Sequence, residues 1–200
     1  NIFRGFSMIK VLGVSSSMRE FSFSAKALEI ALNNAKENRA EIQFLNLQKT
    51  PLPMFYSTTE KTENIRKVTE MVKWADAFIL ATPDYHGSMA GSMKNFLDYY
   101  WSEFAGKLFG YICASHEKGL TAMDQMRTAI RQCYGWSMPY GVSINGDEDF
   151  ENREIKNLQL KSRLEMLSRD LTVYGEIIRN QFLQDLKSDV SNSFSKHYGK

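Results

Sequence analysis

The segment DAFILATPDYHGS, residues 76–88, begins as an almost uninterrupted apolar run and ends in a loop rich in turn-forming residues. Residues 76–81 have the length and composition of a central parallel strand that is buried on both faces. Apolar residues at helical spacing follow over residues 93–104. Pro83 and Gly87 interrupt both patterns and let backbone N–H groups face a bound molecule. A strand that enters a helix through such a loop is typical of the ligand-binding edge of an open α/β sheet.

The same unit of strand, loop and helix recurs along the whole chain. Further strands are expected at residues 8–14, 41–47, 107–115 and 138–144, with helical patterns between them. Right-handed crossovers between parallel strands place helices on both faces of the sheet. We therefore predict an α/β fold with a five-stranded parallel sheet in the flavodoxin-like order 2-1-3-4-5. Such a sheet binds ligands at the switch point between its first and third strands.

Length and composition indicate one domain. The 200 residues contain enough apolar side chains for a single core. We expect residues 8–182 to form this domain, residues 1–7 to be a native extension or a remnant of cloning, and residues 183–200 to form a polar, Ser-rich tail. The net charge of +2 comes from interspersed signs, so we expect no nucleic-acid partner.

The sequence contains no run of roughly 20 apolar residues, the length that a membrane-spanning helix requires. Its start also lacks the long apolar core of a secretory signal. These two observations predict a cytoplasmic protein without membrane contact.

Metal chemistry is not expected. Cys113 and Cys133 lack metal-ligand spacing and are expected to be small buried side chains. His86, His116 and His197 lie far apart in the sequence and lack Cys or carboxylate companions at ligand spacing. The prediction is therefore a protein without a metal site.

Hydroxyl groups crowd the loop after the first strand, where residues 15–24 read SSSMREFSFS. The N–H groups and partial positive charge at a helix start attract anions. Hydroxyls of Ser17, Ser22 and Ser24 with the Arg19 guanidinium would complete a phosphate cradle, and a terminal monophosphate fits it best. A P-loop or a dinucleotide fingerprint would need glycines that this loop lacks. The alternative is that Ser22 or Ser24 only caps the helix.

The loops after the first and third strands together resemble those of the NADPH-dependent FMN reductase family, a branch of the flavodoxin-like quinone and azo-dye reductases. The family's first loop reads Gly-Ser-x-Arg-x-x-Ser-x-Asn, and its matches here are Ser17, Arg19 and Ser22, with Ser16 for Gly and Ser24 for Asn. The second loop reads Thr-Pro-Glu-Tyr-Asn-Gly-Ser-x-Pro-Gly-x-Leu-Lys-Asn, and its matches are Thr82, Pro83, Tyr85, Gly87, Ser88, Gly91, Lys94 and Asn95. The departures are Asp84, His86, Ala90 and Met93.

This resemblance implies an enzyme that passes hydride from NADPH or NADH to FMN and on to a small acceptor, such as a flavin, a quinone or an azo compound, by a ping-pong mechanism. No catalytic dyad is expected, because the cofactor carries the hydride. The implied FMN contacts are Ser17, Arg19, Ser22, Phe23 and Ser24 at the phosphate, and Pro83, Asp84, Tyr85, His86, Gly87, Ser88 and Ser115 at the ring. Tyr85 is expected to line the ring face. The family commonly places its flavin at a subunit boundary, which implies a homodimer or homotetramer.

One loop departs from the family, and two other functions stay open. Residues 115–119 read SHEKG, where the family often has a Gly-rich segment. His116 or Lys118 is a candidate for the 2′-phosphate of NADPH, against the alternative of solvated loop charges. A flavodoxin-type electron carrier is disfavoured because such carriers are strongly acidic and this chain is slightly basic. A non-catalytic flavin-binding module would use the same loops.

Overall fold

Seven strands form the main sheet of the computed structural model, which describes residues 8–199. They are β1 (Lys10–Ser15), β2 (Glu41–Asn46), β3 (Ala77–Tyr85), β4 (Ser88–Met89), β5 (Leu108–Ala114), β6 (Trp136–Ser137) and β7 (Val142–Ile144). The main path is β2-β1-β3-β5-β6; β4 pairs with β3 antiparallel, and β7 pairs with β5 parallel. The predicted extension at residues 1–7 lies outside the described residues.

The prediction of five strands is therefore wrong, for two local reasons. His86 and Gly87 adopt positive φ angles of 58° and 75°, which fold the chain back so that β4 pairs with the end of β3. Of the last strand expected at residues 138–144, only Val142–Ile144 forms a strand, β7, and β6 forms just before the expected range; the two pair separately with β5. Pro139 lies between these two strands and has no N–H to donate to a ladder.

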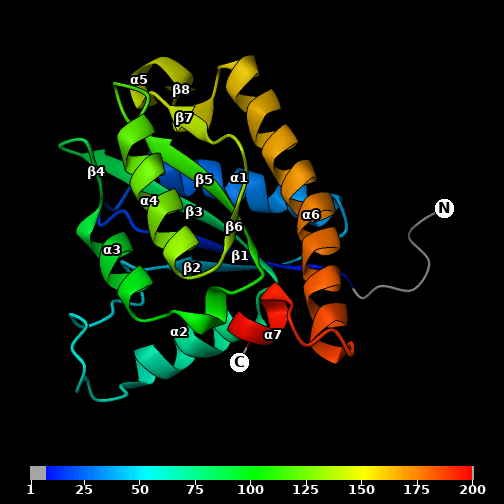
Figure 1. Ribbon diagram of the computed structural model, residues 1–200. Coiled ribbons are helices and arrows are strands. Elements are labelled where there is room, and N and C mark those ends of the chain that lie inside the picture. Colours follow the sequence, from blue (N-terminus) through cyan, green and yellow to red (C-terminus); the bar gives the residue numbers. More distant parts are fainter. Residues whose placement is uncertain (1–7, 200) are drawn as a thin grey trace.

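Helices cover both faces of the sheet, as predicted. They are α1 (Phe23–Glu37), α2 (Glu63–Trp74), α3 (Gly91–Asp98), α4 (Leu120–Gln132), α5 (Gly146–Asp149), α6 (Leu158–Lys187) and α7 (Phe194–Tyr198), with a 3₁₀ turn at Ser102–Phe104. Alternate strand residues point to opposite faces, so Leu12 packs with α2, α3 and α4, whereas Val11 packs with α1 and α6. Figure 1 shows α3 and α4 in front of the sheet and α1 behind it.

Parallel pairing brings the carboxyl ends of β1, β3 and β5 to one edge of the sheet. Ser15 pairs with Ala81, and Pro83 with Ala114. Beyond these strands, the Ser16 N–H still donates to the Ala81 carbonyl at 3.0 Å. The loops that follow β1, β3 and β5 consequently meet at this edge.

The chain beyond α5 forms two further elements. A small hairpin of β8 (Phe150–Glu151) and β9 (Glu154–Ile155) precedes the long helix α6. The expected start of the polar tail, residue 183, falls inside α6. Phe194 of α7 packs against Phe182 of α6 with ring centroids 5.7 Å apart, so the end of the chain is attached to the domain by aromatic contacts.

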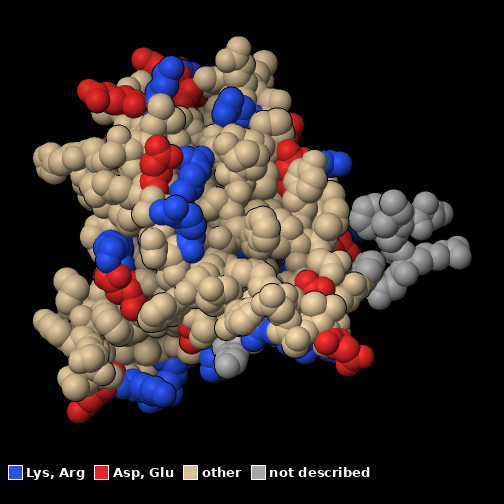
Figure 2. All heavy atoms as spheres, viewed as in Figure 1, with Lys and Arg blue, Asp and Glu red and all other residues tan. Residues whose placement is uncertain are grey.

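Charges of both signs are interspersed over the surface that Figure 2 presents, which includes α3, α4 and α6. Attraction by bulk charge is therefore a weak way to recruit a partner to this face. Among the described residues, no helix combines the length and apolar character that crossing a membrane would require.

Candidate functional site

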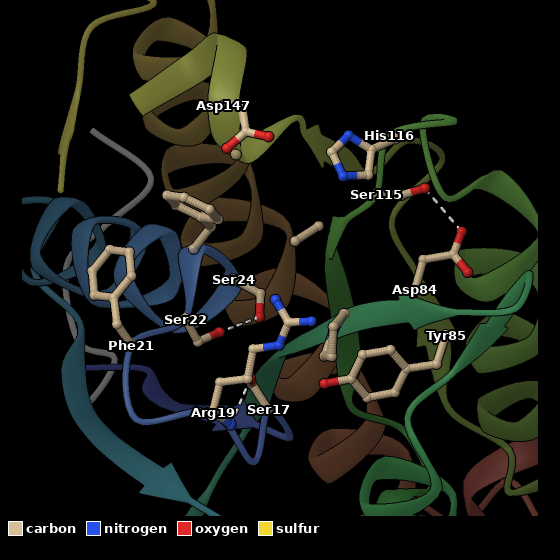
Figure 3. A pocket seen from close by; sticks show the side chains of 14 residues that line it. Ser17, Arg19, Phe21, Ser22, Ser24, Asp84, Tyr85, Ser115, His116 and Asp147 are labelled. Carbon is tan, nitrogen blue, oxygen red and sulfur yellow. Dashed lines mark hydrogen bonds between the residues drawn. The ribbon is translucent and has the colours of Figure 1, made fainter. Parts of the chain in front are cut away.

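A cavity of about 350 Å³ lies where the loops after β1, β3, β5 and β7 meet. Figure 3 shows side chains from all four loops pointing into it. Its lining residues are Ser17, Arg19, Phe21, Ser22, Phe23, Ser24, Pro83, Asp84, Tyr85, Ala114, Ser115, His116, Gly146 and Asp147. The cavity thus occupies the switch point at which an open α/β sheet binds its ligand.

The start of α1 supplies several hydrogen-bond donors to this cavity. Ser22 caps the helix, because its Oγ accepts the Ala25 N–H at 3.3 Å, and it also contacts the Oγ of Ser24 at 2.9 Å. Within residues 8–199, the N–H groups of Phe23 and Ser24 have no hydrogen-bond acceptor. Ser22 therefore caps the helix and also lines the cavity, and the same end of the helix retains free donors for an anion.

Arg19 adds a positive charge to this donor set. Its own N–H is held by the Ser17 Oγ at 3.3 Å, and in Figure 3 its guanidinium extends between Ser24 and Tyr85. No carboxylate in the described part of the chain lies within 4.0 Å of this guanidinium. A guanidinium without a carboxylate partner beside serine hydroxyls fits a phosphate group.

The opposite wall is formed by the end of β3 and its turn, which two side chains hold in place. The Asp84 carboxylate accepts the Gly87 N–H at 2.8 Å and the Ser115 hydroxyl at 2.9 Å. From α4, the Gln125 side-chain oxygen accepts the Ser88 hydroxyl at 2.8 Å and the Met89 N–H at 3.2 Å. This turn is therefore fixed from both sides, and it presents an aromatic ring to the cavity.

That ring belongs to Tyr85, which is 38% exposed and lines the cavity with Pro83 and Ala114. Flat apolar walls opposite an anion cradle suit a planar ring that carries a phosphate. A family model described as NADPH-dependent FMN reductase matches residues 9–149 of the chain. The chain belongs to this family. The protein is therefore an FMN-dependent NAD(P)H oxidoreductase, and the resemblance inferred from the two loops is confirmed.

Individual relatives of this FMN reductase family member agree with the assignment. The NADPH azoreductase of Bacillus sp. (strain OY1-2) is 26% identical over 174 residues, which cover 84% of this chain and 96% of the relative. The FMN-dependent NADPH-azoreductase of Staphylococcus aureus is 28% identical over 156 residues, which cover 73% and 81%.

A solved structure shares the fold. FerB, a flavoenzyme NAD(P)H:(acceptor) oxidoreductase from Paracoccus denitrificans, superposes with a TM-score of 0.72 at 17% identity. The match covers 84% of this chain and 98% of FerB. The α/β flavodoxin-like architecture predicted from the sequence is thereby supported, apart from the number of strands.

The structure brings together most of the residues that the resemblance named for this reductase. Those that line the cavity are Ser17, Arg19, Ser22, Phe23, Ser24, Pro83, Asp84, Tyr85 and Ser115. His86 and Gly87 form the tip of the turn after β3 and do not line it. Ser88 faces a separate groove beside α4. His86, Gly87 and Ser88 therefore belong to the turn that supports this wall and are not part of the cavity lining.

Five of the lining residues were not predicted to contact FMN: Phe21, Ala114, His116, Gly146 and Asp147. His116 had been considered only for the 2′-phosphate of NADPH, together with Lys118, which lies outside the lining set. Gly146 and Asp147 follow β7, the last strand of the sheet. The rule that ligands bind beyond strand carboxyl ends could have found them.

The buried thiol nearest the cavity is not a nucleophile. Burial, with a smaller effect from the negative charge of Asp84, raises the pKa of Cys113 to about 12. Its side chain is therefore a neutral thiol at physiological pH. In the described part of the chain, no three His, Cys, Asp or Glu side chains gather in an arrangement that could hold a metal ion.

Proposed function

We propose that FMN binds in this cavity, with its phosphate at the start of α1 and its ring beside Tyr85. The observation that carries the proposal is the union, in one cavity, of the Arg19 guanidinium, serine hydroxyls and free helix N–H groups with an aromatic wall. These donors match a terminal phosphate, and Pro83 and Ala114 add apolar surface for the ring. Ser115 fixes the wall through Asp84.

Bound FMN supplies the capacity to carry hydride between NAD(P)H and an acceptor. The chain's residues bind and orient it: Arg19 and Ser17 hold the anionic end, and Asp84 keeps the wall in place. Tyr85 is 38% exposed, so NAD(P)H and the acceptor can approach the same side in turn. This accessibility supports a ping-pong cycle.

The acceptor that we propose is a small planar aromatic compound of the azo or quinone class. Two curated relatives carry the name azoreductase, and the exposed Tyr85 ring offers a face on which a flat molecule can stack. Steady-state rates with an azo dye, a quinone and free FMN, at equal NADPH, rank these acceptors. A rate with free FMN that exceeds both of the others would contradict this choice.

An absorbance experiment tests the site and the activity together. The purified protein is titrated with FMN, freed of excess flavin, and mixed anaerobically with NADPH or NADH. We expect bound-flavin absorbance that bleaches without a second protein. Flavin that binds but does not bleach would favour an electron carrier or a non-catalytic module, and a failure to bind FMN would reject the site.

We further propose a cytoplasmic location and a homo-oligomer. Both cysteines are free thiols, which agrees with a reducing compartment such as the cytoplasm. A homodimer or homotetramer is supported by the exposed apolar residues Met166, Tyr174 and Ile177 on α6. Light scattering would measure the oligomeric state. We propose that the flavin-binding domain begins at residue 8 and extends beyond the expected residue 182, because α6 continues to Lys187 and α7 packs on it.

A further inference from the structure

Residues 145–157 form a small unit that is organised around one carboxylate. Asp149 is 7% exposed, and its two oxygens accept the Asn145 N–H at 2.7 Å and the Asn157 side-chain N–H at 2.6 Å. The carboxylate thus ties the two ends of the segment together. Helix α5 and the β8–β9 hairpin between those ends are held in a defined position as a result.

This unit packs directly on the residues that begin α1. Phe150 of β8 contacts Phe23 with ring centroids 4.9 Å apart. Gly146 lies so close that a Cβ added there would overlap the Phe23 ring. An ion pair of 3.0 Å joins Lys26 of α1 to Glu154 of β9. The phosphate end of the cavity is therefore supported by a segment more than 120 residues away in sequence.

The tip of the hairpin extends this support to the next aromatic ring. Asn152 and Arg153 adopt positive φ angles of 49° and 66°, as in the two-residue turns that favour hairpins. The turn places the Arg153 guanidinium carbon 4.9 Å from the centre of the Phe21 ring. Phe21 in turn meets Phe23 edge to face at 5.2 Å. Both phenylalanines line the cavity.

Figure 3 shows where Phe21 lies relative to the cradle. Phe21 lies on the side of Ser22 and Ser24 that is away from Tyr85. A ligand whose ring lies beside Tyr85 and whose phosphate lies at these serines would have Phe21 beyond its phosphate. A group attached to that phosphate on this side would meet the Phe21 ring.

We propose that the β8–β9 hairpin, through Arg153 and Phe150, holds Phe21 and Phe23 as a wall that selects flavins ending in a monophosphate. FMN ends at that phosphate. FAD carries a further phosphate and an adenosine there, which the wall obstructs. This inference rests on the proposed FMN site, and it assigns Arg153 as a positioning residue that acts through Phe21.

The test removes the positioning cation without disturbing the backbone. Arg153→Gly is the main variant, because glycine favours positive φ. The matched control is Arg39→Gly, since Arg39 is also exposed, has a φ of 69° and lies beyond the other end of α1. Dissociation constants of FMN, FAD and riboflavin are measured by flavin fluorescence for wild type and both variants. Phe21→Ala, which removes the ring itself, is the second variant.

In wild type we expect FMN to bind more tightly than FAD. Arg153→Gly should lower the FMN-over-FAD affinity ratio by about two- to fivefold, the size of an exposed cation–π contact. Phe21→Ala should lower it further through a gain in FAD affinity, and Arg39→Gly should leave it unchanged. An unchanged ratio in both Arg153→Gly and Phe21→Ala would overturn the proposal. So would an equal loss for all three flavins, which indicates a general structural role.

The experiment distinguishes a failure of the FMN site from a failure of the aromatic wall. If wild type does not bind FMN, the proposed site itself is wrong. If wild type binds FMN and the variants do not change the FMN-over-FAD affinity ratio, the FMN site is supported and the proposed role of the wall is rejected.

Discussion

The two ends of the sheet are held by different forces. At the carboxyl end, the cavity walls are fixed by side-chain hydrogen bonds such as those of Asp84 and Gln125, and by turns with positive φ. At the amino end, aromatic packing closes the sheet: Phe182 contacts Phe194, and Tyr134 stacks on Tyr198 at 3.8 Å. Apolar packing there supplies stability, which leaves the carboxyl end able to keep polar groups open for a ligand.

The amino end also contains a buried charge. Lys107 is 4% exposed, donates to the Val72 carbonyl at 3.0 Å and lies over the Phe78 ring. Burial, reinforced by the nearby positive charge of Arg179, lowers the pKa of Lys107 to about 8. The extensive aromatic packing at this end offsets the free-energy cost of burying the Lys107 ammonium group.

Phe182→Ala is the strongest test of the difference between the two ends. The ring is 6% exposed and packs against Gly106 and Phe194, so its loss should lower the free energy of unfolding by about 3–4 kcal/mol. Urea denaturation measures this loss. Leu158→Ala, an exposed apolar position on the same helix, is the control and should change little. A large fall in FMN affinity for folded Phe182→Ala would show that the two ends are not independent.

Lys107→Met sharpens the same comparison through pH. The pKa of Lys107 is about 8 in the folded protein and 10.5 as its ordinary value, so the unfolded chain binds the proton more tightly. Stability of wild type relative to Lys107→Met should therefore rise by roughly 2–3 kcal/mol between pH 8 and 10.5. Below about pH 7, where Lys107 carries its proton in both states, the difference should be constant. Denaturation at several pH values measures it, and a flat difference across this range would contradict the buried charge.

Arg19→Ala probes the carboxyl end, where we expect an effect on binding rather than on folding. Loss of a charge-assisted contact to the phosphate should weaken FMN binding by about 1.5–3 kcal/mol. Riboflavin, which lacks the phosphate, should bind as before, and the unfolding free energy of the apoprotein should not change. Fluorescence titration with both flavins measures these effects. Equal losses of affinity for FMN and riboflavin would show that Arg19 does not contact the phosphate.

Gln125→Leu should give the smallest effect. It leaves the Ser88 hydroxyl and the Met89 N–H without their acceptor, at a cost of about 1 kcal/mol. Gln125→Glu keeps a side-chain oxygen as acceptor and is the matched control. Urea denaturation compares the two variants. If Gln125→Leu is as stable as wild type, the turn after β3 is held by Asp84 alone.

The sequence was most informative where structure depends on local pattern. Buried apolar runs such as residues 76–81 predict strands directly, and the loops that follow them carry most of the cavity lining. The two-residue strand β4 could not be predicted in this way, because a pattern needs more residues than it offers. The division of the last strand depends on Pro139 and on separate pairing with β5.

The part of the site that was missed depends on contacts between distant segments. Phe21 and Gly146 line the cavity, and their partners lie far away in the sequence: Arg153 lies over the Phe21 ring, and Gly146 packs on Phe23. Periodicity within a segment carries no information about such contacts. The aromatic attachment of Phe194 to Phe182 was missed for the same reason.

Parallel pairing also determines when the site can form during synthesis. β1 pairs with β3, so Val11 finds its partner Ala77 only after α1, β2 and α2 have been synthesised. The cavity further needs Ala114 and Asp147, so the growing chain must extend past α5 before all of its walls exist. Since chains fold as they emerge from the amino terminus, FMN should join a chain that is nearly complete rather than guide its early folding. A fragment that ends before β5 should therefore retain no flavin.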